Sequence, residues 1–154
     1  MRLPRRRRQR PGAVSLEGLV IFGVFMTLCL GTLDLGIGVF QYHIVSEAAR
    51  QGARQAIVHG QMAPASWNGG PWGPSAINSK ANATGIPLVT AIQPYLVGID
   101  LSQATIKAQW LDEGNAPDQR VRVTVTSTYQ PCITFIFADT TYSLSATSTM
   151  PIAH

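Results

Sequence analysis

The most constraining feature of this chain is an apolar run that begins almost directly after a cluster of arginines. Six of the first ten residues are arginine, and no charged residue occurs from Gly18 to Leu33. The 23 residues from Gly18 to Phe40 would form a helix about 34 Å long, which is enough to cross a bilayer core. Because arginines cross a bilayer only at high cost, they hold the N-terminus in the cytoplasm while the rest is exported.

This topology divides the chain into three parts. We expect a basic cytoplasmic leader at residues 1–12, a transmembrane helix at residues 13–59 that continues outside the membrane, and a small extracytoplasmic α+β domain at residues 60–154. The leader holds half of the twelve basic residues, and six basic residues then face eight acidic ones, a formal charge of −2. The high isoelectric point therefore describes the leader, and the composition argues against a nucleic-acid partner.

Two carboxylates stand at the edge of the apolar run and inside it, where a charge is costly unless it serves a partner or a polar path. Glu17 is either a helix-start carboxylate favoured by the helix dipole or a group that neutralises the terminal amine of an adjacent subunit. Asp34, about 25 Å further along the helix, either snorkels to the outer interface or pairs with a basic group of another subunit.

A small-residue junction precedes Glu17 on the cytoplasmic side of the apolar run. Gly12 offers a peptidase an unhindered backbone, and Ala13 follows it. We therefore expect processing at Gly12 and Ala13, with Glu17 five residues past the glycine.

The helix is expected to continue into water and to end near Gly60, a residue typical of helix C-termini. Apolar residues recur there at helical spacing, which predicts a mild apolar stripe: Ile44, Ala48, Ala49, Ala53, Ala56 and Ile57. Of the two nearby arginines, only Arg50 is close enough along the helix to pair with Glu47.

The remainder predicts a loop, a short helix and a small antiparallel sheet of about three strands. Glycines and prolines at residues 61–75 indicate a loop, in which Trp67 and Trp72 pack, rest on headgroups or bind a ligand. A helix is expected at residues 87–97, and alternating patterns predict strands at 105–111, 119–129 and 141–150. An apolar tip, Pro131 to Phe137, is expected to point to the membrane or against the long helix.

The exported part contains no nucleophile–base constellation, phosphate-binding loop or paired carboxylate site, so we expect no enzyme and no cofactor. With Cys29 embedded in lipid, it cannot approach Cys132 closely enough for a disulfide within one subunit, and no Cys/His cluster has metal-ligand spacing. His43 is expected to be solvated or to lie at the membrane interface.

Several of these features together resemble the TadE-like family, the pilin-like proteins (pseudopilins) of the tight-adherence type IV pilus system. The features are the Gly12-Ala13 junction with Glu17, the apolar helix, Leu33-Asp34-Leu35-Gly36, and the run Ala48-Ala49-Arg50-Gln51-Gly52-Ala53-Arg54. The resemblance is strongest over residues 12–58. It implies cleavage between Gly12 and Ala13 by a prepilin peptidase and a role as a minor component in pilus assembly, with other pilin-like subunits and the assembly machinery as partners. Gly18 departs from the family, whose junctions often carry a bulky apolar residue there.

Two other hypotheses are compatible with the same residues. One is an uncleaved single-pass protein of the cytoplasmic membrane whose outer domain binds a partner. The other is a secreted protein cleaved after Ala48, although its apolar segment is long for a signal peptide and contains Asp34. The mature N-terminus distinguishes them: Ala13 for the pilin-like protein, Met1 or Arg2 for the anchor, and Ala49 for the secreted protein.

Overall fold

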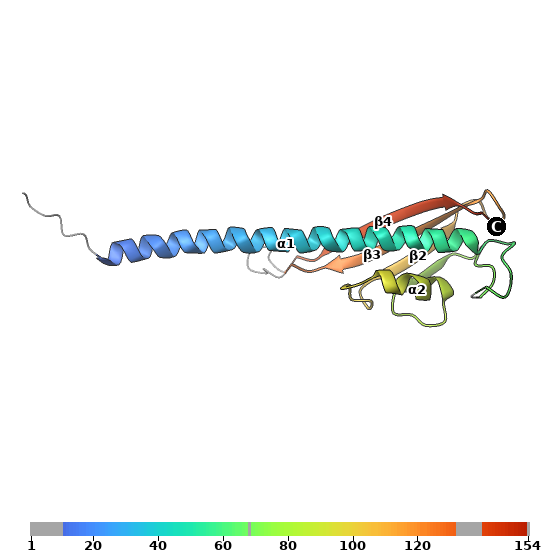
Figure 1. Cartoon of the computed structure of the whole chain (residues 1–154), viewed down its shortest axis with the longest axis horizontal. Helices are drawn as coiled ribbons and strands as arrows, with labels where there is room; N and C mark the ends of the chain where they lie inside the picture. The colour runs from blue at the N-terminus through green and yellow to red at the C-terminus, as the bar shows by residue number, and fades with distance from the viewer. Residues whose placement is uncertain (1–10, 68, 132–139, 154) are drawn as a thin grey trace, which may run out of the picture.

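The protein is a long helix with a small sheet packed along its C-terminal half (Figure 1). The computed structural model describes residues 11–67, 69–131 and 140–153, with side chains from Ser15 onward. The elements in chain order are α1 (Pro11–Val58), β1 (Ile77–Lys80), α2 (Pro87–Ile92), a 3-10 turn (Gln93–Tyr95), β2 (Thr105–Trp110), β3 (Arg120–Tyr129) and β4 (Tyr142–Pro151). The predicted α+β class is confirmed.

Helix α1 runs without a break for 48 residues. Pro11 stands at its first position, where a missing N–H costs nothing, and the next proline in the chain is Pro64. The helix ends at Val58, two residues before the predicted Gly60. The predicted membrane helix and its extension outside are therefore one continuous rod.

The sheet is antiparallel throughout, in the order β1-β2-β3-β4. It has four strands rather than about three, because the sequence analysis missed β1. That strand has four residues and only one strongly apolar side chain, Ile77, so its pattern is too short to read. The other three strands lie within about one residue of their predicted bounds.

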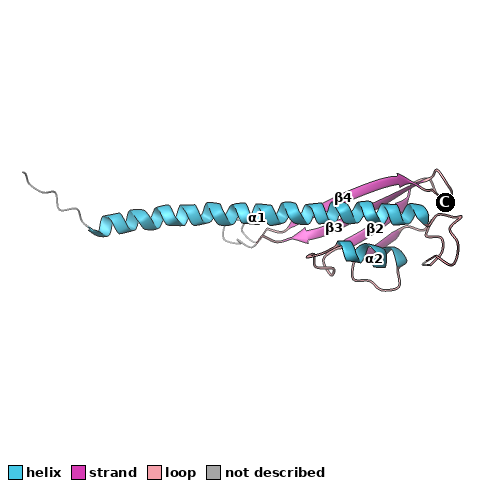
Figure 2. Ribbon diagram, in the orientation of Figure 1, coloured by secondary structure: helices cyan, strands magenta, loops and turns pink. Residues whose placement is uncertain are grey.

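One face of the sheet packs on α1, and Figure 2 shows the helix lying along the strands. On β3, Val121, Val123 and Val125 are fully buried, while the residues between them point outward. The predicted stripe on α1 meets this face, and Ala48, Ala49, Ala53 and Ala56 are all buried. Alanine carries only a methyl group and glycine has no side chain, so the helix axis lies close to the sheet.

Helix α2 is shorter than predicted. The expected helix at residues 87–97 ends as an α-helix at Ile92 and tightens into a 3-10 turn through Tyr95. Pro94 lies within that turn and has no N–H to continue the α-helical ladder. Leu88, Val89 and Ile92 are buried in the core.

The expected irregular loop at residues 61–75 is confirmed for its described residues. Within it, Trp72 is buried and Trp67 is exposed over 47% of its surface. Residues Cys132–Phe137 of the predicted apolar tip lie outside the described residues, as do the arginines of the leader.

Candidate functional site

The N-terminal part of α1, from Ser15 to Leu33, makes few contacts with the rest of the protein, and we call it the bare segment. Between Ser15 and Leu33 the apolar side chains are widely exposed, as at Leu19 (67%), Phe25 (56%) and Leu28 (66%). This is the one helix among the described residues that is long and apolar enough to cross a membrane by length and composition. Such a surface needs lipid or other apolar helices around it.

Glu17 lies at the start of this bare segment and is exposed. The backbone at Gly12 and Ala13 is already helical, while their side chains lie outside the described residues. The candidate processing residues and Glu17 therefore belong to one continuous helix, separated by about one turn. In hydrocarbon, the carboxylate of Glu17 would require a counter-charge or a polar path.

Asp34 is only 4% exposed, unlike its neighbours on the helix. The hydroxyl of Tyr129, at the end of β3, donates a hydrogen bond to Asp34 Oδ1 at 2.6 Å and also lies 2.9 Å from the Asp34 carbonyl oxygen. The ring of Tyr129 also lies close to Gly38, 3.4 Å from where a Cβ would stand. Asp34 thus has a partner within its own chain, which sequence reasoning did not name.

The Asp34–Tyr129 contact lies at the end of the sheet that is nearest to the bare segment of α1. An apolar groove of about 440 Å³ opens there, between α1 and the ends of β3 and β4. Its lining includes Tyr42, Tyr129 and Tyr142. The segment before this contact, Ser15 to Leu33, is about 28 Å long. Beyond it, Leu35, Val39 and Phe40 are still 67%, 57% and 62% exposed.

The sequence motif from Ala48 to Arg54 places its small residues and its arginines on two different faces of α1. Ala48, Ala49, Gly52 and Ala53 face the sheet and are buried, whereas Arg50 and Arg54 are exposed. Arg50 pairs with Glu47 at 3.9 Å, as predicted. The small residues of this motif therefore dock the helix, and its arginines face solvent.

Gly52 is tightly packed against Ile92 of α2 and Val123 of β3. A Cβ placed there would lie 2.5 Å from Ile92 Cδ1, 3.0 Å from Ile92 Cγ1 and 3.1 Å from Val123 Cγ1. Contacts this short mean that a side chain at this position fits only if the side chain of Ile92 shifts.

A buried polar cluster closes the far end of the domain, and the sequence analysis did not predict it. His59 stacks on Trp72 with ring centroids 3.8 Å apart. Asn115 accepts a hydrogen bond from Trp110 Nε1 at 3.0 Å and donates to the carbonyl oxygens of His59 and Trp72. Asn115 thereby ties the end of α1, the irregular loop and the β2–β3 connection together, a structural role.

No group of three or more His, Cys, Asp or Glu side chains that could hold a metal ion occurs among the described residues. His43 is exposed on α1. Cys29 is a free, half-buried cysteine in the bare segment. The site is therefore an apolar segment of α1 with the carboxylate of Glu17 near one end and that of Asp34 at the other.

Comparison with known proteins identifies this helix. Residues 12–54 match the family model described as TadE-like protein, so the resemblance seen in the sequence is confirmed over that segment. No curated protein and no solved structure matches the chain. The matched residues extend from the glycine junction to the last arginine of the helix motif.

Proposed function

We propose that this chain, whose helix α1 matches the TadE-like family, is a pseudopilin or minor pilin that takes part in assembly of a tight-adherence type IV pilus. In this proposal a prepilin peptidase removes the leader between Gly12 and Ala13. The chain is a structural subunit and not an enzyme. The observation that supports this proposal is the structure of α1. Its N-terminal half is apolar and exposed, and its C-terminal half packs on a folded domain.

The assembly step follows from the physics of that bare surface. Cleavage leaves a charged amine on Ala13, and the helix then moves from lipid into a bundle of like helices. Glu17 lies four residues further on, about 6 Å along the axis. A small axial offset between neighbouring helices would bring the carboxylate of one to the amine of the next. Such a pair is worth more in this low-dielectric setting than in water.

In the proposed topology the C-terminal domain lies outside the cytoplasmic membrane and the leader lies inside. The membrane then surrounds Ser15 to Leu33, and Asp34 lies at the outer interface. The alternative of secretion after cleavage behind Ala48 is disfavoured, because Ala48 and Ala49 are 0% and 1% exposed in the middle of the helix–sheet contact. Removing the preceding residues would also take Val45 out of the core. The uncleaved anchor stays as the rival hypothesis.

The mature N-terminus tests the processing step. It should be Ala13 for the cleaved pilin-like protein, Met1 or Arg2 for the uncleaved anchor, and Ala49 for the secreted protein. The assembly step is tested with Glu17→Ala, which should insert into membranes as the wild type does but assemble poorly. Glu47→Ala is the matched control, since it removes an exposed carboxylate from the same helix outside the bare segment. Normal pilus formation by Glu17→Ala would contradict the charge-pairing mechanism.

A further inference from the structure

All four basic residues of the domain at residues 60–154 lie on one face of the sheet. Lys80, Lys107, Arg120 and Arg122 occupy the outward positions of β1, β2 and β3, opposite the face that packs on α1. In the register of the sheet, Lys107 stands opposite Thr124, while Arg122 stands opposite Gln109. Lys107 and Arg122 are therefore diagonal neighbours, about 7–8 Å apart at the backbone. We call this outward surface the cationic face.

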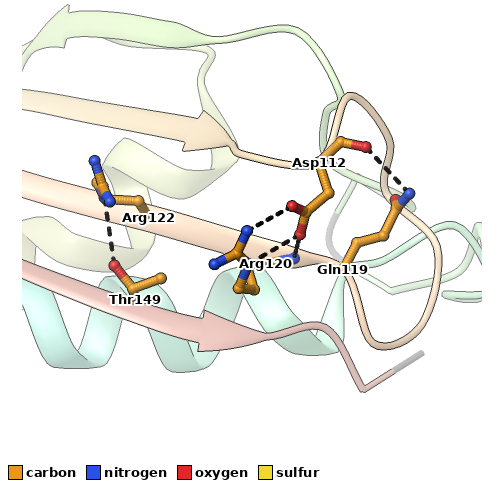
Figure 3. Close-up of polar contacts among 5 residues, drawn as sticks. All are labelled: Asp112, Gln119, Arg120, Arg122 and Thr149. Atoms are coloured by element: carbon orange, nitrogen blue, oxygen red, sulfur yellow. Dashed lines mark hydrogen bonds and ion pairs between the residues drawn. The ribbon is translucent and has the colours of Figure 1, made fainter.

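The carboxylates of the same domain that the structure describes lie in its connections and not on the strands that carry these cations. Among the described residues, none lies within a strand: Asp100 precedes β2, and Asp112, Glu113 and Asp118 lie in the β2–β3 connection. Arg120 binds Asp112 with an N–O distance of 2.8 Å (Figure 3). Glu113 and Asp118 are both exposed. We call the connection from Leu111 to Gln119 the acidic turn.

Internal contacts neutralise only part of the cationic face. The pKa of the Asp100 carboxyl is lowered mainly by hydrogen bonds from Ser102 and, to a smaller degree, by the charge of Lys80. Arg122 reaches Thr149 at 3.4 Å on β4, as Figure 3 shows. The two ion pairs found within the described residues involve neither Lys107 nor Arg122. These two cations are exposed on a rigid sheet.

The acidic turn is equally ordered. The side chain of Gln119 accepts a hydrogen bond from the Ala116 amide at 2.8 Å and donates to the Asp112 carbonyl oxygen at 3.3 Å. The Asp118 amide donates to the Ile152 carbonyl oxygen at 3.0 Å, next to β4. The carboxylates of Glu113 and Asp118 are therefore carried by a fixed backbone, which lowers the entropy lost on binding.

We propose that the cationic face of one copy, at Lys107 and Arg122, receives the acidic turn of a neighbouring copy through Glu113 and Asp118. The charges of the two surfaces are complementary, whereas two cationic faces would repel each other. The contact is consequently heterologous, with a different surface on each partner. Contacts of this kind repeat from copy to copy into an open filament unless they close into a ring.

This inference rests on the proposed function, because pilus assembly places copies side by side. Exposed ion pairs are weak and are screened by salt. The contact therefore selects the offset between neighbouring copies, while burial of the bare helices drives their association. The sheet stands beside α1 rather than across its end (Figure 1), so its outward face is open to a lateral neighbour.

A carbodiimide tests the contact directly, because it condenses a lysine amine with a carboxylate to an amide with loss of water, and adds no spacer. Membranes that contain the full-length chain and its assembly system are treated, and linked dimers are digested and analysed by mass spectrometry. We expect a peptide that joins Lys107 to Glu113 or Asp118. Co-expressing tagged and untagged copies shows that the link lies between two chains. Dimers linked only through other residues would overturn the proposal.

Charge reversal provides the second test. Lys107→Glu and Glu113→Lys should each lower the fraction of chain in large assemblies about fivefold, the factor expected for a strong exposed pair. Combining both reversals in one chain should restore most of the loss. The milder variant Lys107→Gln should lower the fraction by a smaller factor. Thr90→Glu, on the exposed side of α2, is its control, since both changes make the net charge more negative by one.

The outcomes separate this inference from the proposed function. If the single reversals have no effect while the wild-type chain assembles, only the inference fails. If the double reversal is as defective as the singles, the cationic face binds a different acidic partner, and the inference also fails. If the wild-type chain forms no assemblies, the proposed function itself is contradicted.

Discussion

Substituting Gly52 by alanine tests the packing of α1 against Ile92 of α2 and Val123 of β3. In an unhindered helix this change stabilises by about 1 kcal/mol, because alanine is the better helix former. Here the new Cβ would lie 2.5 Å from Ile92 Cδ1 and 3.1 Å from Val123 Cγ1. Overpacking of this kind costs about 1–3 kcal/mol. We therefore expect a net effect between about zero and 2 kcal/mol of destabilisation.

The assay is thermal unfolding of the full-length chain in detergent, followed by circular dichroism. For a domain of this size each kcal/mol corresponds to a shift in Tm of about 4–8 °C. Gly36→Ala is the matched control, since no atom of the described residues lies within 4 Å of a Cβ at that position. A double variant with Ile92→Val removes the Cδ1 atom that the new methyl group meets. We expect Gly52→Ala to cost less in that background than in the wild type.

The reasoning fails if Gly52→Ala raises the Tm as much as the control does. That result would mean that α1 does not approach Ile92 of α2 and Val123 of β3 this closely. Equal effects of Gly52→Ala in the wild type and in the Ile92→Val background would refute the specific contact, even if the variant were destabilised.

The remaining predictions concern two hydrogen-bonded carboxylates. Tyr129→Phe removes the hydroxyl that donates to the buried carboxylate of Asp34, so it should destabilise the chain by about 1–3 kcal/mol. The control is Tyr142→Phe, at an exposed tyrosine of the same groove, which should change the Tm little. Equal effects of the two variants would contradict a stabilising Asp34–Tyr129 hydrogen bond. The pKa of Asp112 is lowered, chiefly by a side-chain hydrogen bond from Arg120. Its contribution to stability is therefore complete above the unfolded pKa of about 4 and is lost as pH falls through the folded value. Asp112→Asn should have a lower Tm than the wild type at pH 7, and the difference should shrink below about pH 4; a difference that stays constant down to about pH 3 would contradict this.

The sequence predicted the elements whose pattern is local. The alternation of Val121, Val123 and Val125 is enough to define β3 and its buried face, and helical spacing of Ala48, Ala49 and Ala53 is enough to define the docking stripe. Strand β1 was missed because four residues carry too little pattern. The end of α2 was missed because the effect of Pro94 within an apolar segment depends on packing.

The contacts of the site could not be predicted for a different reason. Tyr129 and Asp34 are 95 positions apart in the chain, and neither residue carries a signal that names the other. The same holds for Asn115, whose partners His59 and Trp72 lie 56 and 43 positions away. Such pairings follow from the register of the sheet on the helix, which is a property of the whole fold.

The carboxylates at the two ends of the bare segment suggest how the chain meets a bilayer in the proposed topology. Between Glu17 and Asp34 the uncharged helix has sixteen residues, Gly18 to Leu33, or about 24 Å. A bilayer core is about 30 Å thick, so the uncharged segment alone is too short. The difference in length is covered if the end of the sheet at Tyr129 enters the membrane interface, where tyrosines are commonly found. Tyr42 and Tyr142 line the groove at that level, and the hydroxyl of Tyr129 covers the carboxylate that would otherwise face lipid. In the proposed topology, the Asp34–Tyr129 hydrogen bond would let the domain lie directly at the membrane surface.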